Sequence, residues 1–133
     1  MSTAKRDRIE SILNSLRGRD LDPHYLAYFQ CFNQGLYFEA HEVLEALWLP
    51  RRKEADGTFY KGLIQLAGAF VHVHKGRPQP ALALLRLAAS NLASFGPTYE
   101  NLNVDEVLLL IERWIANINE LGAMPAPQLK LGK

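Results

Sequence analysis

A histidine and a glutamate, His41 and Glu45, stand four positions apart in the sequence, and Trp48 follows one helical turn later. In a helix, side chains at positions i and i+4 lie on the same face and can meet. An imidazole beside a carboxylate can bind a metal ion or transfer a proton, and a neighbouring aromatic ring can exclude water. These three residues are therefore the first candidates for a functional site.

The segment that begins at His41 differs by one residue from the His-Glu-x-x-His signature of zinc proteases. That signature needs two imidazoles one turn apart and a glutamate between them as the general base. Here the second ligand position is Glu45, and the helical wheel places Glu39 and Glu42 on another side, which we expect to face solvent. Zinc protease chemistry is therefore not predicted.

A second polar stripe is predicted on the following helix, where Lys61, Gln65, Gly68 and His72 share one side of an otherwise apolar segment. A helix that is apolar on most sides is normally buried, and a buried polar group without a partner costs about 1–3 kcal/mol. We therefore expect Gln65 and His72 to face the polar flank of the preceding helix. Lys61 would then lie at the mouth of a pocket between the two helices.

Three of these side chains form a candidate ligand set, in which His41, Glu45 and His72 would hold a divalent metal ion. Two imidazoles and one carboxylate suit zinc, iron or manganese. The same residues also permit an acid–base pair or, alternatively, a buried polar layer that only fixes the packing of the two helices. The sequence indicates no substrate class, so it leaves open whether the protein is an enzyme.

Helical periodicity runs through the whole chain, and no segment alternates as a strand would. We expect an all-α fold of about six helices, packed as antiparallel helical hairpins in a compact, bundle-like array. Asp22 and Asn103 are predicted N-caps, because each precedes a run with helical spacing of apolar residues. The six helices are predicted near residues 3–16, 23–34, 37–49, 58–74, 78–95 and 104–118.

Two turns between these helices resemble each other. Gly35 and Gly76 each follow a predicted helix, and an alanine stands five positions after each glycine, at Ala40 and Ala81. Glycine commonly ends a helix, and alanine lets the next helix pack closely. This weak repeat supports stacked helical hairpins and not a long repeat array.

The composition is that of one folded domain of 133 residues, with 48% hydrophobic residues and a formal net charge of +1. Such a balanced charge argues against nucleic acid as a partner. The one cysteine, Cys31, is expected to be a small buried hydrophobe.

The chain has no apolar leader segment and no run that could span a membrane, so we expect a soluble, cytoplasmic protein. The domain is expected at 1–122, followed by a loose tail at 123–133.

The segment from Phe32 to Trp48, followed by Lys61-Gly62-Leu63-Ile64-Gln65-Leu66-Ala67, resembles the bacterial and archaeal family of unknown function numbered 309. The resemblance extends over about residues 28–91. It implies a small all-helical, prokaryotic protein whose His-x-x-x-Glu-x-x-Trp motif binds metal. In this chain the motif is His41, Glu45 and Trp48. The family pattern has a further histidine after that tryptophan, at a position where this chain has Thr58.

Two hypotheses follow for the function. In the first, a pocket between the third and fourth helices binds a metal ion or a small ligand. Its predicted lining residues are His41, Glu45, Trp48, Lys61, Gln65 and His72. In the second, the protein is a helical-hairpin interaction module, and these residues form only a buried packing network. A homodimer or another protein partner would fit the second hypothesis, through an exposed apolar groove.

Overall fold

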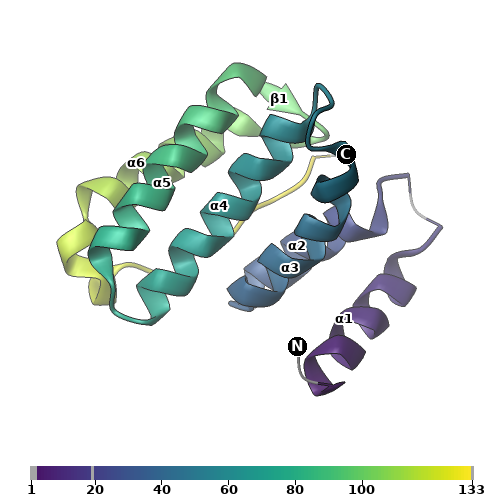
Figure 1. The fold of residues 1–133 in the computed structure, drawn as a ribbon. Coiled ribbons are helices and arrows are strands. Elements are labelled where there is room, and N and C mark those ends of the chain that lie inside the picture. Colours follow the sequence, from purple (N-terminus) through teal and green to yellow (C-terminus); the bar gives the residue numbers. More distant parts are fainter. Residues whose placement is uncertain (1–2, 19, 133) are drawn as a thin grey trace.

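The computed structural model describes residues 3–18 and 20–132, and this part of the chain is mostly helical (Figure 1). Its six α-helices are α1 (Thr3–Leu16), α2 (Pro23–Asn33), α3 (Tyr37–Trp48), α4 (Gly57–His74), α5 (Pro78–Leu92) and α6 (Val104–Ala116). Short 3-10 helices follow three of them: η1 (Leu49–Arg51), η2 (Ala93–Phe95) and η3 (Ile118–Ala123). The predicted all-α fold is confirmed, and the predicted helix boundaries agree closely with the observed ones.

Consecutive helices pack against one another, and the most extensive contacts are between α4 and α5, α2 and α3, and α3 and α4. Helix α4 is therefore the centre of the array, with α3 on one side and α5 on the other (Figure 1). Helix α6 packs against α5, and α1 packs against α2 at the other end. Among the described residues, no helix is long and apolar enough to cross a membrane.

The two turns that resemble each other in the sequence have the same structure. Gly35 has φ +77° and Gly76 has φ +66°, a left-handed conformation that glycine adopts without a steric penalty. At the first turn the amide of Leu36 donates to the carbonyl of Cys31 at 2.9 Å, and at the second the amide of Arg77 donates to His72 at 2.9 Å. These bonds are those of a Schellman cap, which reverses the chain at the end of a helix.

Both predicted N-caps are confirmed. The Asp22 carboxylate accepts a hydrogen bond of 2.7 Å from the amide of His24, and Pro23 occupies the first helical position. The Asn103 side chain accepts one of 3.0 Å from the amide of Glu106. Each cap satisfies a backbone N–H that has no partner inside the helix, which fixes where α2 and α6 begin.

Aromatic rings fill the core between α2, α3 and α4. Tyr28 and Phe32 are fully buried, and Phe32 contacts the rings of Tyr37 and Phe70 at centroid distances of 5.0 and 5.6 Å. The hydroxyl of Tyr28 donates to the backbone carbonyl of Leu63 in α4 at 2.6 Å. This hydrogen bond satisfies the phenol, so a tyrosine can occupy the core at little cost.

A short antiparallel hairpin, β1 (Thr98–Tyr99) and β2 (Leu102–Asn103), precedes α6 and is not predicted from the sequence. Its turn residues, Glu100 and Asn101, both have positive φ, at 48° and 61°. Two paired residues on each side are too short to produce an alternating pattern, and Glu is not a typical residue for a left-handed turn.

The segment after residue 122 is predicted to be loose, whereas in the structure its last part packs on the helices. The amide of Leu129 donates to the side-chain oxygen of Asn33 at 2.7 Å, and the Asn33 side-chain nitrogen donates to the carbonyl of Leu129 at 2.8 Å. Leu129 is 3% exposed, and Leu131 forms a β-bridge with Leu102. Asn33 thus anchors an extended segment that has no periodicity of its own.

Candidate functional site

His41 and Glu45 lie together on the outer flank of α3, as the spacing predicts. The Nε2 atom of His41 is 3.5 Å from a carboxylate oxygen of Glu45, and their side chains are 31% and 43% exposed. The Nδ1 atom of His41 is buried and has no hydrogen-bond partner among the described residues. The ring therefore presents Nε2 to the carboxylate and to solvent, while its other nitrogen faces protein.

Aromatic side chains flank this pair along α3. The ring of Phe38, one turn before His41, lies 5.9 Å from the imidazole, centroid to centroid. Trp48, one turn after Glu45, is half-buried and packs against the core. The pair therefore lies on a partly apolar surface, which lowers the local dielectric compared with open water.

The polar stripe of α4 is expected to face α3, whereas two of its members, Gln65 and Gly68, face α5 in the structure. The Nδ2 atom of Asn91 in α5 donates a hydrogen bond of 2.6 Å to the side-chain oxygen of Gln65. A Cβ atom at Gly68 would lie 3.3 Å from a methyl carbon of Leu84, which is also in α5. The expected pairing of Gln65 with the α3 residues is therefore wrong.

His72 stands four residues after Gly68 and so shares this side of α4. Its Nδ1 atom is buried without a hydrogen-bond partner among the described residues. Within residues 3–18 and 20–132, no three His, Cys, Asp or Glu side chains form a group that could hold a metal ion. The structure therefore brings together two of the three proposed ligands, His41 and Glu45, and does not add His72 to them.

Lys61 is exposed near the start of α4. Three cavities in the described part of the chain, of about 650, 600 and 370 Å³, are lined by residues from other regions. The expected lining set of His41, Glu45, Trp48, Lys61, Gln65 and His72 contributes no side chain to any of them. The predicted site is thus a surface pair on α3 and not one of these cavities.

Glu39 departs from the expectation that it faces solvent. It is 8% exposed and accepts a hydrogen bond of 2.7 Å from the guanidinium of Arg8 in α1. This ion pair connects α1 to α3 and partly compensates the cost of burying the carboxylate. Arg8 lies 31 positions away in the sequence, so the helical wheel of α3 alone could not reveal it.

Cys31 is buried, as the sequence predicts. Burial, together with the nearby charge of Glu39, raises the pKa of the Cys31 thiol to about 11. The thiolate form is therefore rare at neutral pH, and Cys31 is not an activated nucleophile. Burial also raises the pKa of Tyr60 to about 12, so this phenol stays protonated.

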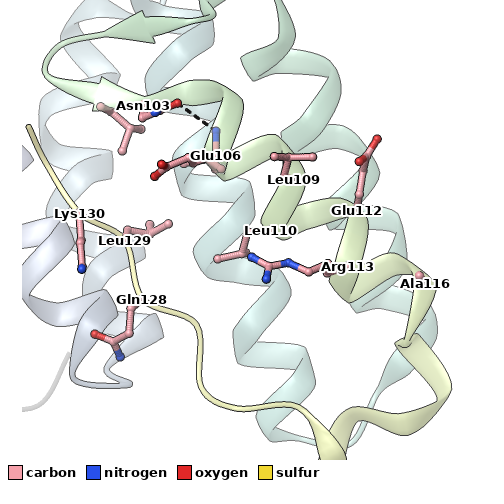
Figure 2. A pocket seen from close by; sticks show the side chains of 12 residues that line it. Asn103, Glu106, Leu109, Leu110, Glu112, Arg113, Ala116, Gln128, Leu129 and Lys130 are labelled. Atoms are coloured by element: carbon pink, nitrogen blue, oxygen red, sulfur yellow. Dashed lines mark hydrogen bonds between the residues drawn. The ribbon is translucent and has the colours of Figure 1, made fainter.

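The largest of the three cavities is a groove between α6 and the segment 128–130, and it lies outside the predicted site (Figure 2). A sequence signal for it exists in the run of five apolar residues from Val107 to Ile111. An amphipathic helix can bury only part of such a run in one core. Val107 and Ile111 are buried, whereas Leu109 is 58% exposed.

Residues 25–84 match the family described as Domain of unknown function (DUF309), so the resemblance noted in the sequence is confirmed for that segment. The chain is also 28% identical over 94 residues to an uncharacterized protein of Aquifex aeolicus (strain VF5). That match covers 71% of this chain and 28% of the relative, so the chain spans well under half of the relative's length. No solved structure matches the chain.

Proposed function

We propose that this small helical protein binds a divalent metal ion on the flank of α3, through His41 Nε2 and Glu45. The observation that carries the proposal is the distance of 3.5 Å between these two ligand atoms. This is long for a hydrogen bond. Two ligands of a tetrahedral ion, each about 2.0–2.1 Å from the metal, would be separated by about 3.3–3.4 Å.

The exposure of the pair determines what kind of site this would be. Both side chains are about one-third to two-fifths exposed, and a third protein ligand is not seen among the described residues. The remaining coordination positions would therefore be filled by water or by a small anionic ligand. Such an open site supplies a Lewis acid at the protein surface, and its two protein ligands predict modest affinity.

Calorimetric titration of the untagged protein with Zn²⁺ and with Mn²⁺ tests the proposal. We expect one ion per chain in the wild type and binding at least about tenfold weaker in His41→Ala and in Glu45→Gln. Circular dichroism checks that the variants remain helical. Wild-type affinity in His41→Ala would overturn the proposal.

The chain offers a matched control in a second exposed histidine–carboxylate pair. The Nδ1 atom of His24 lies 3.3 Å from Asp22, and these side chains are 34% and 44% exposed. Asp22 already accepts a hydrogen bond from the backbone as the N-cap of α2, so its carboxylate is committed. We expect His24→Ala to bind the ion as the wild type does. Equal weakening in both variants would show that the ion binds any such pair, and would also overturn the proposal.

A second candidate is the helical interaction module, and the bond between Gln65 and Asn91 favours it. This bond uses the polar stripe of α4 to join two helices, which is the behaviour of a packing network. Exposed apolar residues such as Leu49 and Leu87, at 45% and 50%, would then be available to a protein partner. Under this candidate the titration detects no metal ion in the wild type, and His41→Ala lowers the free energy of unfolding without any other measurable change.

A further inference from the structure

The groove beside α6 combines apolar lining with charges of both signs. Its volume is about 650 Å³, and its lining includes Leu109, Leu110 and Leu129. Two acidic residues and two basic residues complete the rim: Glu106, Glu112, Arg113 and Lys130. A site for a charged ligand would concentrate one sign of charge, whereas a balanced rim is what a self-associating surface needs.

Glu106 and Arg113 lie on α6 at equal sequence distances from the midpoint between Leu109 and Leu110. They stand seven positions apart, which is two turns, so they lie on the same face, and Leu110 lies between them on that face. In Figure 2, Glu106, Leu110 and Arg113 all point toward the groove, while Leu109 stands on its rim. No side-chain ion pair involving Glu106 or Arg113 is found within the described part of the chain.

We propose that a second copy of this chain occupies the groove, with the two α6 helices packed antiparallel about a two-fold axis between Leu109 and Leu110. In such a pair, residue i of one copy meets residue j of the other when i and j are equidistant from the axis. Glu106 then meets Arg113 of the second copy, and Arg113 meets its Glu106. Leu109 enters the other copy's groove beside Leu110.

The exposure of Leu109 supplies the apolar part of this contact. It is 58% exposed, the largest value among the exposed large hydrophobic residues of the described chain. Insertion into a groove lined by Leu110 and Leu129 would remove it from water, and both copies gain the same contact. A helix of this length spans about 20 Å, so the interface is at the small end of stable interfaces and a micromolar dimer is expected.

Sedimentation equilibrium of the full chain between about 1 and 100 µM tests the dimer. We expect the wild type to dimerise and Leu109→Glu to weaken dimerisation by at least about tenfold, because a charge would enter an apolar groove. Leu87→Glu on α5 is the control, since Leu87 is similarly exposed at 50% but lies outside the groove. A monomeric wild type at 100 µM, or equal weakening by Leu87→Glu, would overturn the proposal.

Charge reversal tests the symmetry itself. Glu106→Arg places two like charges in each contact of the homodimer, and so does Arg113→Glu, so each variant alone should be at least about tenfold weaker. An equimolar mixture pairs one chain carrying two arginines with one carrying two glutamates, and it should restore a heterodimer. Restoration cannot come from a variant that fails to fold. A mixture that stays monomeric, although both variants are helical by circular dichroism, would overturn the antiparallel arrangement. The proposal would also be overturned if the groove bound a different protein and no second copy of this chain.

Discussion

Helix α4 packs against α3 on one side and α5 on the other, and the two contacts are built differently. On the α3 side, the ring of Tyr37 lies 5.3 Å from Phe70 and 4.8 Å from the His74 ring. On the α5 side, Gly62 allows close approach, because a Cβ there would lie 2.9 Å from the Cγ of Leu92. Large aromatic rings form the contact between α3 and α4, whereas small residues and an amide hydrogen bond form the contact between α4 and α5.

This difference explains why the polar stripe of α4 faces α5 and not α3. Close helix approach brings Gln65 within hydrogen-bonding distance of Asn91, so that both amides gain a partner where they are partly buried. The α3 side is filled by rings, so a polar stripe there would lose hydration without gaining a partner. His41 and Glu45 consequently pair with each other on α3 and not with residues of α4.

The largest effect is expected from breaking the ring contact. Phe70 is 1% exposed and touches the rings of Phe32, Tyr37 and Trp114. Phe70→Ala should lower the free energy of unfolding by about 3–5 kcal/mol, through lost burial and a residual cavity. Urea denaturation measures it, and Leu87→Ala at an exposed site should change stability by no more than about 0.5 kcal/mol. A loss below about 1 kcal/mol for Phe70→Ala would mean that the rings are not the main contact between the helices.

The second largest loss of stability is expected from a change at the close contact between α4 and α5. Gly62→Ala raises helix propensity, but its Cβ collides with the branch point of Leu92, which is fully buried and has little room to move. We expect a net loss of about 1–2 kcal/mol on urea denaturation, because overpacking outweighs the propensity gain. A stabilised Gly62→Ala would show that α5 can move away from α4 at no cost.

A smaller effect is expected from the amide pair. Gln65→Leu leaves the Asn91 amide without its partner and should lower the free energy of unfolding by about 1 kcal/mol. Combining it with Asn91→Leu should recover part of this loss, because both polar groups are then removed. A double-mutant cycle by thermal denaturation measures the coupling between the two residues. Strict additivity would show that the hydrogen bond contributes nothing to the α4–α5 contact.

The smallest effect on stability is expected at Gly68, the second glycine on the side of α4 that faces α5. A Cβ at Gly68 would lie 3.3 Å from a terminal methyl of Leu84, a flexible and half-buried side chain that can shift. Gly68→Ala should therefore leave stability unchanged or raise it by up to about 1 kcal/mol through helix propensity. A melting temperature lowered by several degrees would contradict the proposed difference between Gly62 and Gly68.

Local signals explain what could be predicted from the sequence. The N-cap at Asp22 followed by Pro23, the N-cap at Asn103 and the glycine turns each act within one helical turn, so short sequence patterns define them. The pairing of His41 with Glu45 is equally local, since one helix positions both residues.

Contacts between distant residues could not be predicted in this way. The partner of Gln65 is 26 positions away, that of Glu39 is 31 positions away, and the partner of Asn33 is 96 positions away. A helical wheel shows which side of α4 is polar, but it carries no information on which neighbouring helix that side meets. Close packing at Gly62 and Gly68 turns that side of α4 toward α5 and not toward the preceding helix.

The attachment of Leu129 to Asn33 has a consequence for dynamics. The segment is attached by side-chain hydrogen bonds of Asn33 and by the burial of Leu129, whereas consecutive backbone hydrogen bonds stabilise the helices, so it should detach without unfolding them. The Leu129 amide, whose hydrogen-bond acceptor is the Asn33 side chain, should therefore exchange with deuterium much faster than the amides inside α4. Because the same segment forms one wall of the groove beside α6, protection of that single amide reports how often the wall opens.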